Sequence, residues 1–312
     1  MPEIPTQMQA VAATPSGPSW TERRQSDVPV PGPGEVLLRV RAFSVNRGEL
    51  ALVRSRGEGW IPGQDLVGEV VALGPDVDVV AAGTRVVALA DWHGWAEYAV
   101  VQAHRLAALP DAVADERAAA LPIAGITALN AVRRGGALLG RRVLVTGASG
   151  GVGDLAVQLA RTAGAEVVAV ARAAHAERMT AVGAAAVVSS PEEADGTFAL
   201  VCEGVGGASL DASIGKLAPD GVAVLYGASA PEPASLSLES FGSAPDARVE
   251  PFFSWRYAEH NGADLATLVS FVAHGRLDVA LGFEGTWDQL NEAMEALADR
   301  RFGGKAVLHI PA

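Results

Sequence analysis

The stretch that decides the fold is residues 143–153, which read VLVTGASGGVG. A β-branched run from Arg142 to Thr146 predicts a strand, and an apolar helix is predicted from Gly153 to Ala163. Glycine permits a tight turn and lets backbone N–H groups approach an anion, while the helix N-terminus adds a dipole that favours a pyrophosphate. The pattern predicts a dinucleotide held by Ser149, Gly150, Gly151, Val152 and Gly153.

Strands and helices alternate beyond this turn. Further strands are predicted at 166–171, 186–189, 199–203 and 222–226, with helices at 174–182 and 210–217. Short apolar strands that alternate with helices require right-handed crossovers, which produce a parallel sheet covered on both faces. The sequence therefore predicts an α/β domain with a doubly wound parallel sheet, the Rossmann arrangement.

The residues before this region have a different character. Val36, Leu38 and Val40 alternate with more polar positions, and similar short runs bounded by Gly, Pro or Asp follow up to about residue 101. The first hundred or so residues are thus predicted to be all-β with barrel-like spacing, and a domain boundary is expected near Leu121-Pro122. After the α/β region, the tail has two amphipathic helix candidates and a final strand candidate at 305–310, which could cap the sheet or rejoin the first domain.

The composition and net charge of the chain indicate which partners and which cellular compartment are expected. Of 312 residues, 49% are apolar, and 24 basic against 36 acidic residues leave a net charge of 24 − 36 = −12. Such a balance disfavours nucleic acid and anionic membranes as partners. The single Cys202 suits a reducing cytoplasm, and we expect a soluble cytoplasmic protein because no signal peptide or apolar span is evident.

The end of the second strand of the α/β region bears on which dinucleotide binds. An acidic residue there would bind the ribose 2′-OH and favour NAD, whereas a basic group suits the extra 2′-phosphate of NADP. This sequence has Arg172 after the strand, with His175 and Arg178 about one helical turn further on. We therefore expect NADPH, although Glu177 lies close by.

Several short motifs, in order, give a more specific resemblance. They are Gly34-Glu35-Val36, Ser44-Val45-Asn46, residues 62–70 (PGQDLVGEV), Gly83-Thr84-Arg85-Val86, residues 95–98 (WAEY), residues 125–128 (GITA), the glycine turn, and Gly304-Lys305-Ala306-Val307-Leu308. From about Met8 to Ile310 the chain resembles the zinc-free, quinone-oxidoreductase-like branch of the medium-chain dehydrogenase/reductase superfamily. The resemblance implies a GroES-like β-barrel catalytic domain of residues 1–121 and 256–312, and a Rossmann cofactor domain of residues 122–255.

The residues argue against a metal. Asn46 stands where the zinc-dependent branch has a Cys, and Gln64-Asp65 stands where that branch has a His-Glu pair. Asn and Gln are uncommon zinc ligands, and the six histidines are scattered without ligand spacing. We expect no catalytic metal.

The resemblance also implies roles for individual residues. It implies that Asn46 and Thr127 contact the cofactor. Asp65 joins these two as a candidate catalytic residue because it could deliver a proton, although it could also be a structural carboxylate bonded to backbone. Further cofactor contacts are implied for Gly204, Tyr226, Gly227, Phe253, Gly303 and Lys305. Three tryptophans that could stack on a flat acceptor are Trp60, Trp92 and Trp255.

One departure from the family limits the functional prediction. Residues 47–60 contain no Tyr, although many relatives carry tyrosines there. Proton delivery is left to water, to Asp65 or to an unnamed residue.

We expect an NADPH-dependent, zinc-independent oxidoreductase that transfers a hydride to a quinone or α,β-unsaturated carbonyl. An enoyl-thioester or polyketide-type enoyl reductase, and an NADPH-binding regulatory protein with little turnover, stay open. A homodimer paired near Arg248 to Phe253 is expected from the family.

Overall fold

The computed structural model describes residues 3–17, 19–242 and 244–311. The chain divides into two compact units. Unit 1 consists of Met1–Ile126 and Tyr257–Ala312, and unit 2 consists of Thr127–Arg256. Within the described ranges, no helix is both long enough and apolar enough to cross a membrane.

Unit 2 is built on a six-stranded sheet in which every neighbouring pair of strands is parallel. Its strands are β8 (Arg142–Val145), β9 (Glu166–Val170), β10 (Ala186–Val188), β11 (Phe198–Glu203), β12 (Leu217–Leu225) and β13 (Arg248–Pro251), in the spatial order β10-β9-β8-β11-β12-β13. The order reverses direction between β8 and β11, and nucleotides bind at the carboxyl ends of strands beside such a reversal. The predicted doubly wound sheet is confirmed.

Two helices of unit 2 begin earlier than the apolar pattern alone indicates. Helix α4 (Gly151–Thr162) starts inside the glycine turn, and α6 (Gly207–Ile214) starts at the glycines that follow β11. Helix α5 (Ala176–Ala181) instead begins two residues later than predicted, after a 3-10 turn at Ala173–His175. Apolar periodicity identifies the buried face of a helix and says little about glycines at its first turn, which explains the shift.

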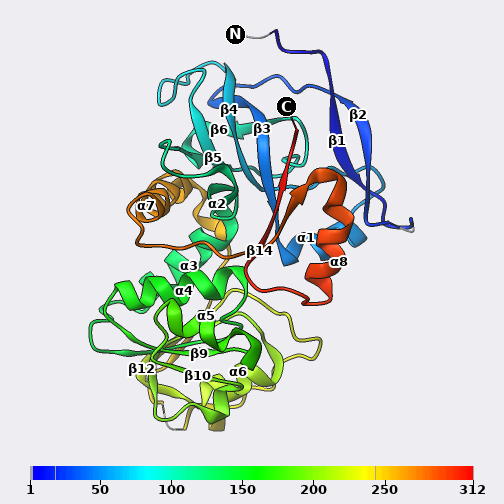
Figure 1. Cartoon of the computed structure of the whole chain (residues 1–312). Coiled ribbons are helices and arrows are strands. Elements are labelled where there is room, and N and C mark those ends of the chain that lie inside the picture. The colour runs from blue at the N-terminus through cyan, green and yellow to red at the C-terminus, as the bar shows by residue number, and fades with distance from the viewer. Residues whose placement is uncertain (1–2, 18, 243, 312) are drawn as a thin grey trace. The chain divides into compact units, whose positions relative to one another are not determined.

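Unit 1 contains a mainly antiparallel seven-stranded sheet. Its strands are β3 (Glu35–Val45), β4 (Asp65–Leu73), β5 (Arg85–Leu89), β6 (Tyr98–Gln102), β7 (Leu106–Ala108), β14 (Leu281–Thr286) and β15 (Lys305–His309). Strand β15, from the C-terminal end of the chain, pairs antiparallel with β3, as the red and blue strands of Figure 1 show. The tail therefore rejoins the first domain, and residues more than 200 positions apart become neighbours.

One helix corrects the all-β prediction for the first hundred residues. Helix α1 (Arg47–Ser55) follows β3 directly, with Asn46 as its N-cap and Glu49 in its first turn. Its buried side chains are Glu49, Leu50 and Val53. Leu50 and Val53 are three residues apart and Glu49 and Val53 are four apart, so all three lie on one face of the helix. Nine residues with only two buried apolar side chains are too short a pattern to be recognised by periodicity. Nevertheless, this helix places Asn46 and Glu49.

The core of unit 1 is formed by buried side chains of its strands together with those of α1 and α8. Phe43 stacks on Trp95 with ring centroids 5.6 Å apart, and both side chains are fully buried. Three further helices belong to this part of the chain or border it: α2 (Asp115–Ala119), α7 (Asn261–Ala273) and α8 (Leu290–Ala298). Helix α3 (Pro122–Arg134) contains the boundary between the two units.

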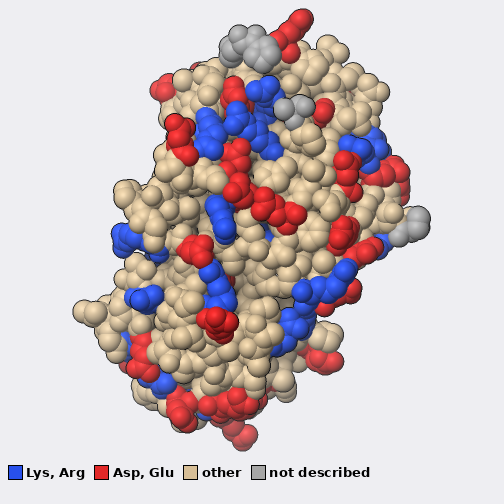
Figure 2. Space-filling model, viewed as in Figure 1, with Lys and Arg blue, Asp and Glu red and all other residues tan. Residues whose placement is uncertain are grey.

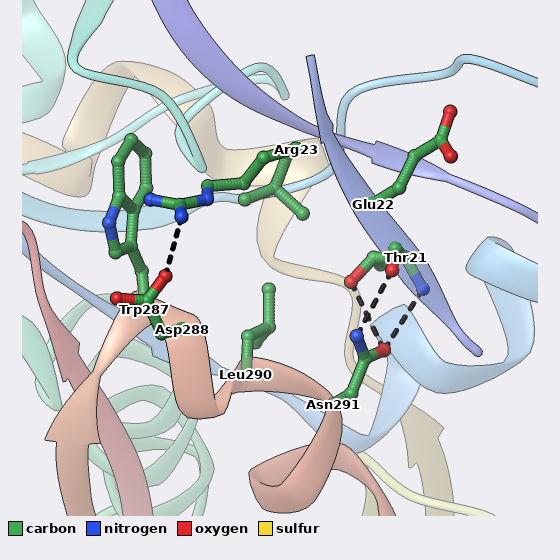
Figure 3. Close-up of a pocket in the computed structure, with 8 residues that line it drawn as sticks. Thr21, Glu22, Arg23, Trp287, Asp288, Leu290 and Asn291 are labelled. Carbon is green, nitrogen blue, oxygen red and sulfur yellow. Dashed lines mark hydrogen bonds and ion pairs between the residues drawn. The ribbon is translucent and has the colours of Figure 1, made fainter.

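A two-stranded ribbon at the start of the chain is attached to α8. It consists of β1 (Gln7–Ala13) and β2 (Thr21–Asp27), which the sequence patterns did not predict. Asn291 Oδ1 accepts hydrogen bonds from the backbone N–H groups of Trp20 and Thr21, at 3.0 Å each. Its Nδ2 donates to the Thr21 carbonyl at 3.0 Å, and Figure 3 shows the contacts between Asn291 and Thr21. Arg23 lies over the Trp287 ring and pairs with Asp288 at 2.8 Å. A shallow pocket separates these two groups of contacts.

Candidate active site

The glycine turn of unit 2 is as tight as the sequence predicts. Gly147 has a φ of +57°, a left-handed conformation that favours glycine. A Cβ on Gly153 would lie 2.4 Å from the Gly147 carbonyl oxygen and 2.7 Å from Ala148 Cα. Only glycine fits where the turn packs this closely on the helix. The Ala148 N–H donates to the Val170 carbonyl at 3.1 Å, which ties the turn to the end of β9.

The start of α4 fits an anionic group. Asp154 N–H donates to the Gly150 carbonyl at 2.9 Å, so the backbone N–H groups of Gly151, Val152 and Gly153 precede the first helical bond. The first N–H groups of a helix lack partners within it and, together with the dipole, favour a phosphate. Ser149 and Gly150 complete the turn. The residues present therefore fit the pyrophosphate of a dinucleotide.

Two of the three predicted basic residues gather after β9. Arg172 Nη2 lies 3.4 Å from His175 Nε2, and the Arg172 side chain is exposed. The third residue, Arg178, has a different environment: its Nε and Nη2 donate to the two carboxylate oxygens of Asp154, at 2.9 Å each. Arg172 and His175 thus lie together at the end of the strand, whereas Arg178 is hydrogen-bonded to Asp154 of α4.

The loops after β11 and β12 are tied to the glycine turn. Gly204 N–H donates to Thr146 Oγ1 at 3.0 Å. A Cβ on Gly204 would meet the Tyr226 ring at 2.8 Å, and one on Gly227 would lie 2.5 Å from the Gly204 carbonyl oxygen. The structure therefore brings the predicted residues Gly204, Tyr226 and Gly227 into direct contact at the carboxyl ends of the strands.

Two residues that sequence reasoning did not assign support this arrangement. Glu203 is fully buried and accepts hydrogen bonds from the N–H groups of Val205 and Gly206, at 2.8 Å each. Thr146 links the turn to Gly204, as described above. Burial raises the pKa of the neighbouring Cys202 thiol to about 12, so this buried thiol stays protonated near neutral pH.

A buried polar cluster occupies the centre of unit 1. Asp65, the first residue of β4, is fully buried. Its Oδ2 accepts hydrogen bonds from Ser44 Oγ (2.7 Å), Asn46 Nδ2 (2.9 Å) and Lys305 Nζ (3.0 Å), and its Oδ1 accepts from the Ile123 N–H (2.9 Å). A carboxylate that accepts bonds from four donors has no proton to deliver. The donor set therefore argues against Asp65 as a proton source.

Lys305 completes the cluster from the other end of the chain. Its side chain is 5% exposed, and Nζ donates to Asp65 Oδ2, to Asn46 Oδ1 and to the Val45 carbonyl. These three acceptors match the three N–H bonds of an ammonium group. Asn46 is consequently held at both ends of its amide, by Lys305 and by Asp65. The geometry makes Lys305 a group that orients Asn46.

Glu49 is the buried acid that sequence reasoning missed. Its two oxygens accept the backbone N–H groups of Asn46 (2.8 Å) and Gln64 (3.1 Å), which joins the turn before α1 to the start of β4. Burial, followed by the negative charge of Asp65, raises the pKa of Glu49 to about 8, against the opposing effect of the two N–H donors and Lys305. Its position three residues after Asn46 is the spacing of a capping box, a signal that could have identified it.

The remaining predicted residues lie in several places. Trp60 and Trp92 are half-buried in unit 1 with ring centroids 5.1 Å apart, so the structure brings this pair together. Trp255 of unit 2 is 67% exposed and lies beside Phe253, with ring centroids 5.8 Å apart. Two others are Thr127, buried in α3, and Gly303, in the turn before β15. Throughout the residues that the structure describes, no group of three or more His, Cys, Asp or Glu side chains could hold a metal ion.

Comparisons with known proteins agree with both units. The model of the alcohol dehydrogenase GroES-like domain matches residues 32–111, and that of the zinc-binding dehydrogenase domain matches residues 151–273. Prostaglandin reductase-3 from Bos taurus is 30% identical over an alignment that covers 99% of this chain and 91% of that protein. A chloroplast envelope quinone oxidoreductase homolog from Arabidopsis thaliana is 38% identical over 57% of this chain and 60% of that protein.

A solved structure extends the likeness over nearly the whole chain. A mycobacterial protein in complex with NADPH superposes with a TM-score of 0.85 at 25% identity, covering 97% of this chain and 100% of the other. The glycine turn, the parallel sheet and these relatives all lead to one conclusion. The chain is an oxidoreductase of the medium-chain dehydrogenase/reductase superfamily and belongs to its quinone-oxidoreductase-like branch.

Proposed function

We propose that the protein uses NADPH, without a metal ion, to reduce a quinone or an α,β-unsaturated carbonyl compound. The observation that carries the proposal is the buried cluster of Asn46, Asp65 and Lys305, which holds an ammonium group at the positions where zinc-dependent relatives have ligands. Asp65 also accepts hydrogen bonds from Ser44 Oγ and from the Ile123 N–H. A divalent cation would have to displace Lys305, so these residues do not fit zinc.

The preference for NADPH is supported by charge after β9. Arg172 and His175 lie together there, no carboxylate follows the strand directly, and a solved neighbour carries NADPH. The amides of residues 151–153 would hold the pyrophosphate. Bound NADPH supplies a hydride at its nicotinamide ring. Asn46, fixed at both ends of its amide, is proposed to orient the nicotinamide and ribose.

We infer the acceptor class from the proposed absence of a metal ion that could act as a Lewis acid. Without a metal to polarise an isolated carbonyl, reduction depends on positioning and on an acceptor that spreads negative charge by conjugation. Quinones and conjugated enones or enals meet this need, and two relatives are a quinone oxidoreductase homolog and a prostaglandin reductase. We assign the proton to water, because Asp65 has none to give. Trp60 and Trp92 are proposed to contact a flat acceptor.

We also propose the binding partners and the cellular location of the protein. On the viewed face, basic side chains gather in several groups, and acidic side chains lie beside each of them (Figure 2). The net charge of −12 favours a small-molecule substrate over a nucleic acid. We propose a cytoplasmic homodimer that binds neither nucleic acid nor membranes.

The test combines nucleotide binding with turnover. NADPH and NADH are titrated by fluorescence against wild type and Arg172→Ala, and NADPH oxidation is then followed with 1,4-benzoquinone, 9,10-phenanthrenequinone, 2-hexenal and an enoyl thioester. We expect NADPH preference that is weakened in the variant, and quinone or enal turnover that a metal chelator does not reduce. Preference for NADH, or loss of turnover on chelation, would contradict the proposal. Turnover confined to the thioester would favour an enoyl reductase, and binding without turnover would favour a regulatory protein.

A further inference from the structure

A buried carboxylate lies in the first turn of α4, the helix whose N-terminus is expected to bind the cofactor phosphates. Asp154 is in the first turn of α4, and its side chain is 3% exposed. An acidic side chain at a helix N-terminus is favoured by the same dipole that favours a phosphate. Here the two negative groups would share one helix end, and a low dielectric would strengthen their repulsion. Asp154 by itself therefore works against nucleotide binding.

Arg178 cancels this charge with a two-pronged contact. Its Nε donates to Asp154 Oδ2 and its Nη2 to Oδ1, at 2.9 Å each. Gln158 Nε2 also donates to Asp154 Oδ1 at 2.8 Å. A guanidinium that faces a carboxylate in this way forms a strong and directional ion pair. The pair joins α4 to α5, which Figure 1 shows as neighbours in unit 2.

The pairing changes what Arg178 does. Its position soon after Arg172 and His175 suggests a third group for the 2′-phosphate of NADPH. However, an arginine that left Asp154 for a phosphate would abandon a buried carboxylate, which is costly. Arg172 Nη2 lies 3.4 Å from His175 Nε2 at the end of β9, and the Arg172 side chain is exposed. The 2′-phosphate is therefore better served by those two.

We propose that Arg178 is a positioning residue that acts through Asp154, keeping the phosphate-binding end of α4 electrically neutral. This inference rests on the proposed function, because it requires a dinucleotide at the start of α4. The pyrophosphate is common to NADPH and NADH, so neutralisation assists both nucleotides equally. A direct contact with the 2′-phosphate would assist NADPH alone, and this difference makes the two roles separable.

The experiment measures dissociation constants for NADPH and NADH by fluorescence in wild type, Arg178→Met, Asp154→Asn and the double variant. We expect Arg178→Met to weaken both nucleotides by roughly tenfold or more at low salt, with a smaller deficit at high salt. Asp154→Asn should bind at least as tightly as wild type. The double variant should recover to within about threefold of wild type, because the unpaired charge is gone.

A matched control and the opposing outcomes complete the design. Arg161→Met removes one positive charge from the other end of α4 and should leave both constants unchanged. A deficit of Arg178→Met confined to NADPH, with no recovery in the double variant, would assign Arg178 to the 2′-phosphate and overturn the inference. Weaker binding by Asp154→Asn, a variant of almost unchanged shape, would also overturn it. Wild type that binds neither nucleotide would instead contradict the proposed function.

Discussion

Asp65 in unit 1 and Asp154 in unit 2 are both buried carboxylates that form an ion pair, but the two pairs are expected to serve different purposes. Each is paired with a cation from another element, Lys305 for Asp65 and Arg178 for Asp154. Lys305 is 5% exposed, whereas Arg178 is 32% exposed and open to water. Removal of the cation should therefore affect folding most in unit 1, and ligand binding most in unit 2.

A third buried acid shows what happens without a dedicated cation. Glu49 receives only two backbone N–H donors, and its pKa rises to about 8, with Asp65 among the causes. The three carboxylates thus differ in their donors rather than in their burial. The donors available to a buried acid depend on which groups the fold brings to it.

The largest expected effect is a loss of stability when Asp65 loses its cation. Lys305→Met removes the ammonium group and leaves a fully buried carboxylate, so we expect the free energy of unfolding to fall by about 3–5 kcal/mol. Urea denaturation followed by circular dichroism measures this change. The double variant Asp65→Asn with Lys305→Met should recover part of the loss. The comparison would break down if Lys305→Met cost no more than Arg301→Ala, which removes an exposed ion pair with Asp299.

The second largest expected effect is a pH dependence of the free energy of unfolding, which is caused by Glu49. Its folded pKa of about 8 lies above the ordinary 4.5, so the folded state binds this proton more tightly than the unfolded state. The contribution to stability is complete below about pH 4.5 and is lost as the pH rises to about 8. We expect the difference in unfolding free energy between wild type and Glu49→Gln to change by a few kcal/mol over this range. A parallel pH profile for the two proteins would contradict the raised pKa.

The smallest effects concern neutral and exposed contacts of the N-terminal ribbon. Asn291→Ala removes the bonds to Trp20 and Thr21, and we expect a loss of about 1–3 kcal/mol. Asp288→Ala breaks an ion pair with Arg23 whose side chains are both about half exposed, so we expect less than about 1 kcal/mol. Thermal unfolding compares the two. Equal losses would show that burial of the contacts does not control their contribution.

The fold was largely predictable because it depends on local patterns. The glycine turn at 147–153, the alternating strands and helices, and the motifs along the chain indicated the Rossmann and GroES-like domains, which the structure and the relatives confirm. Helix α1 and the ribbon of β1 and β2 were missed. Helix α1 is short, and β2 carries mostly charged residues on an exposed strand, so neither has a strong hydrophobic period.

The candidate site was predictable as a set of residues but not as a set of contacts. Asn46, Asp65 and Lys305 were each named from motifs, yet no motif indicates that they bond to one another. Likewise, Arg178 could be assigned a basic role near the cofactor, but its partner Asp154 belongs to a helix 24 residues earlier in the sequence. Side-chain partners at such separations depend on how elements pack.

The sequence by itself determined the class of fold, the place of the phosphate-binding turn and the family, because glycine spacing, strand periodicity and motif order are properties of short segments. Only the tertiary structure decided the electrostatics. The pairing of β15 with β3 brings Lys305 to Asp65 across 240 residues, and the packing of α5 on α4 brings Arg178 to Asp154. Charges act through space at a few ångströms, so their partners are set by the folded chain rather than by neighbours in sequence.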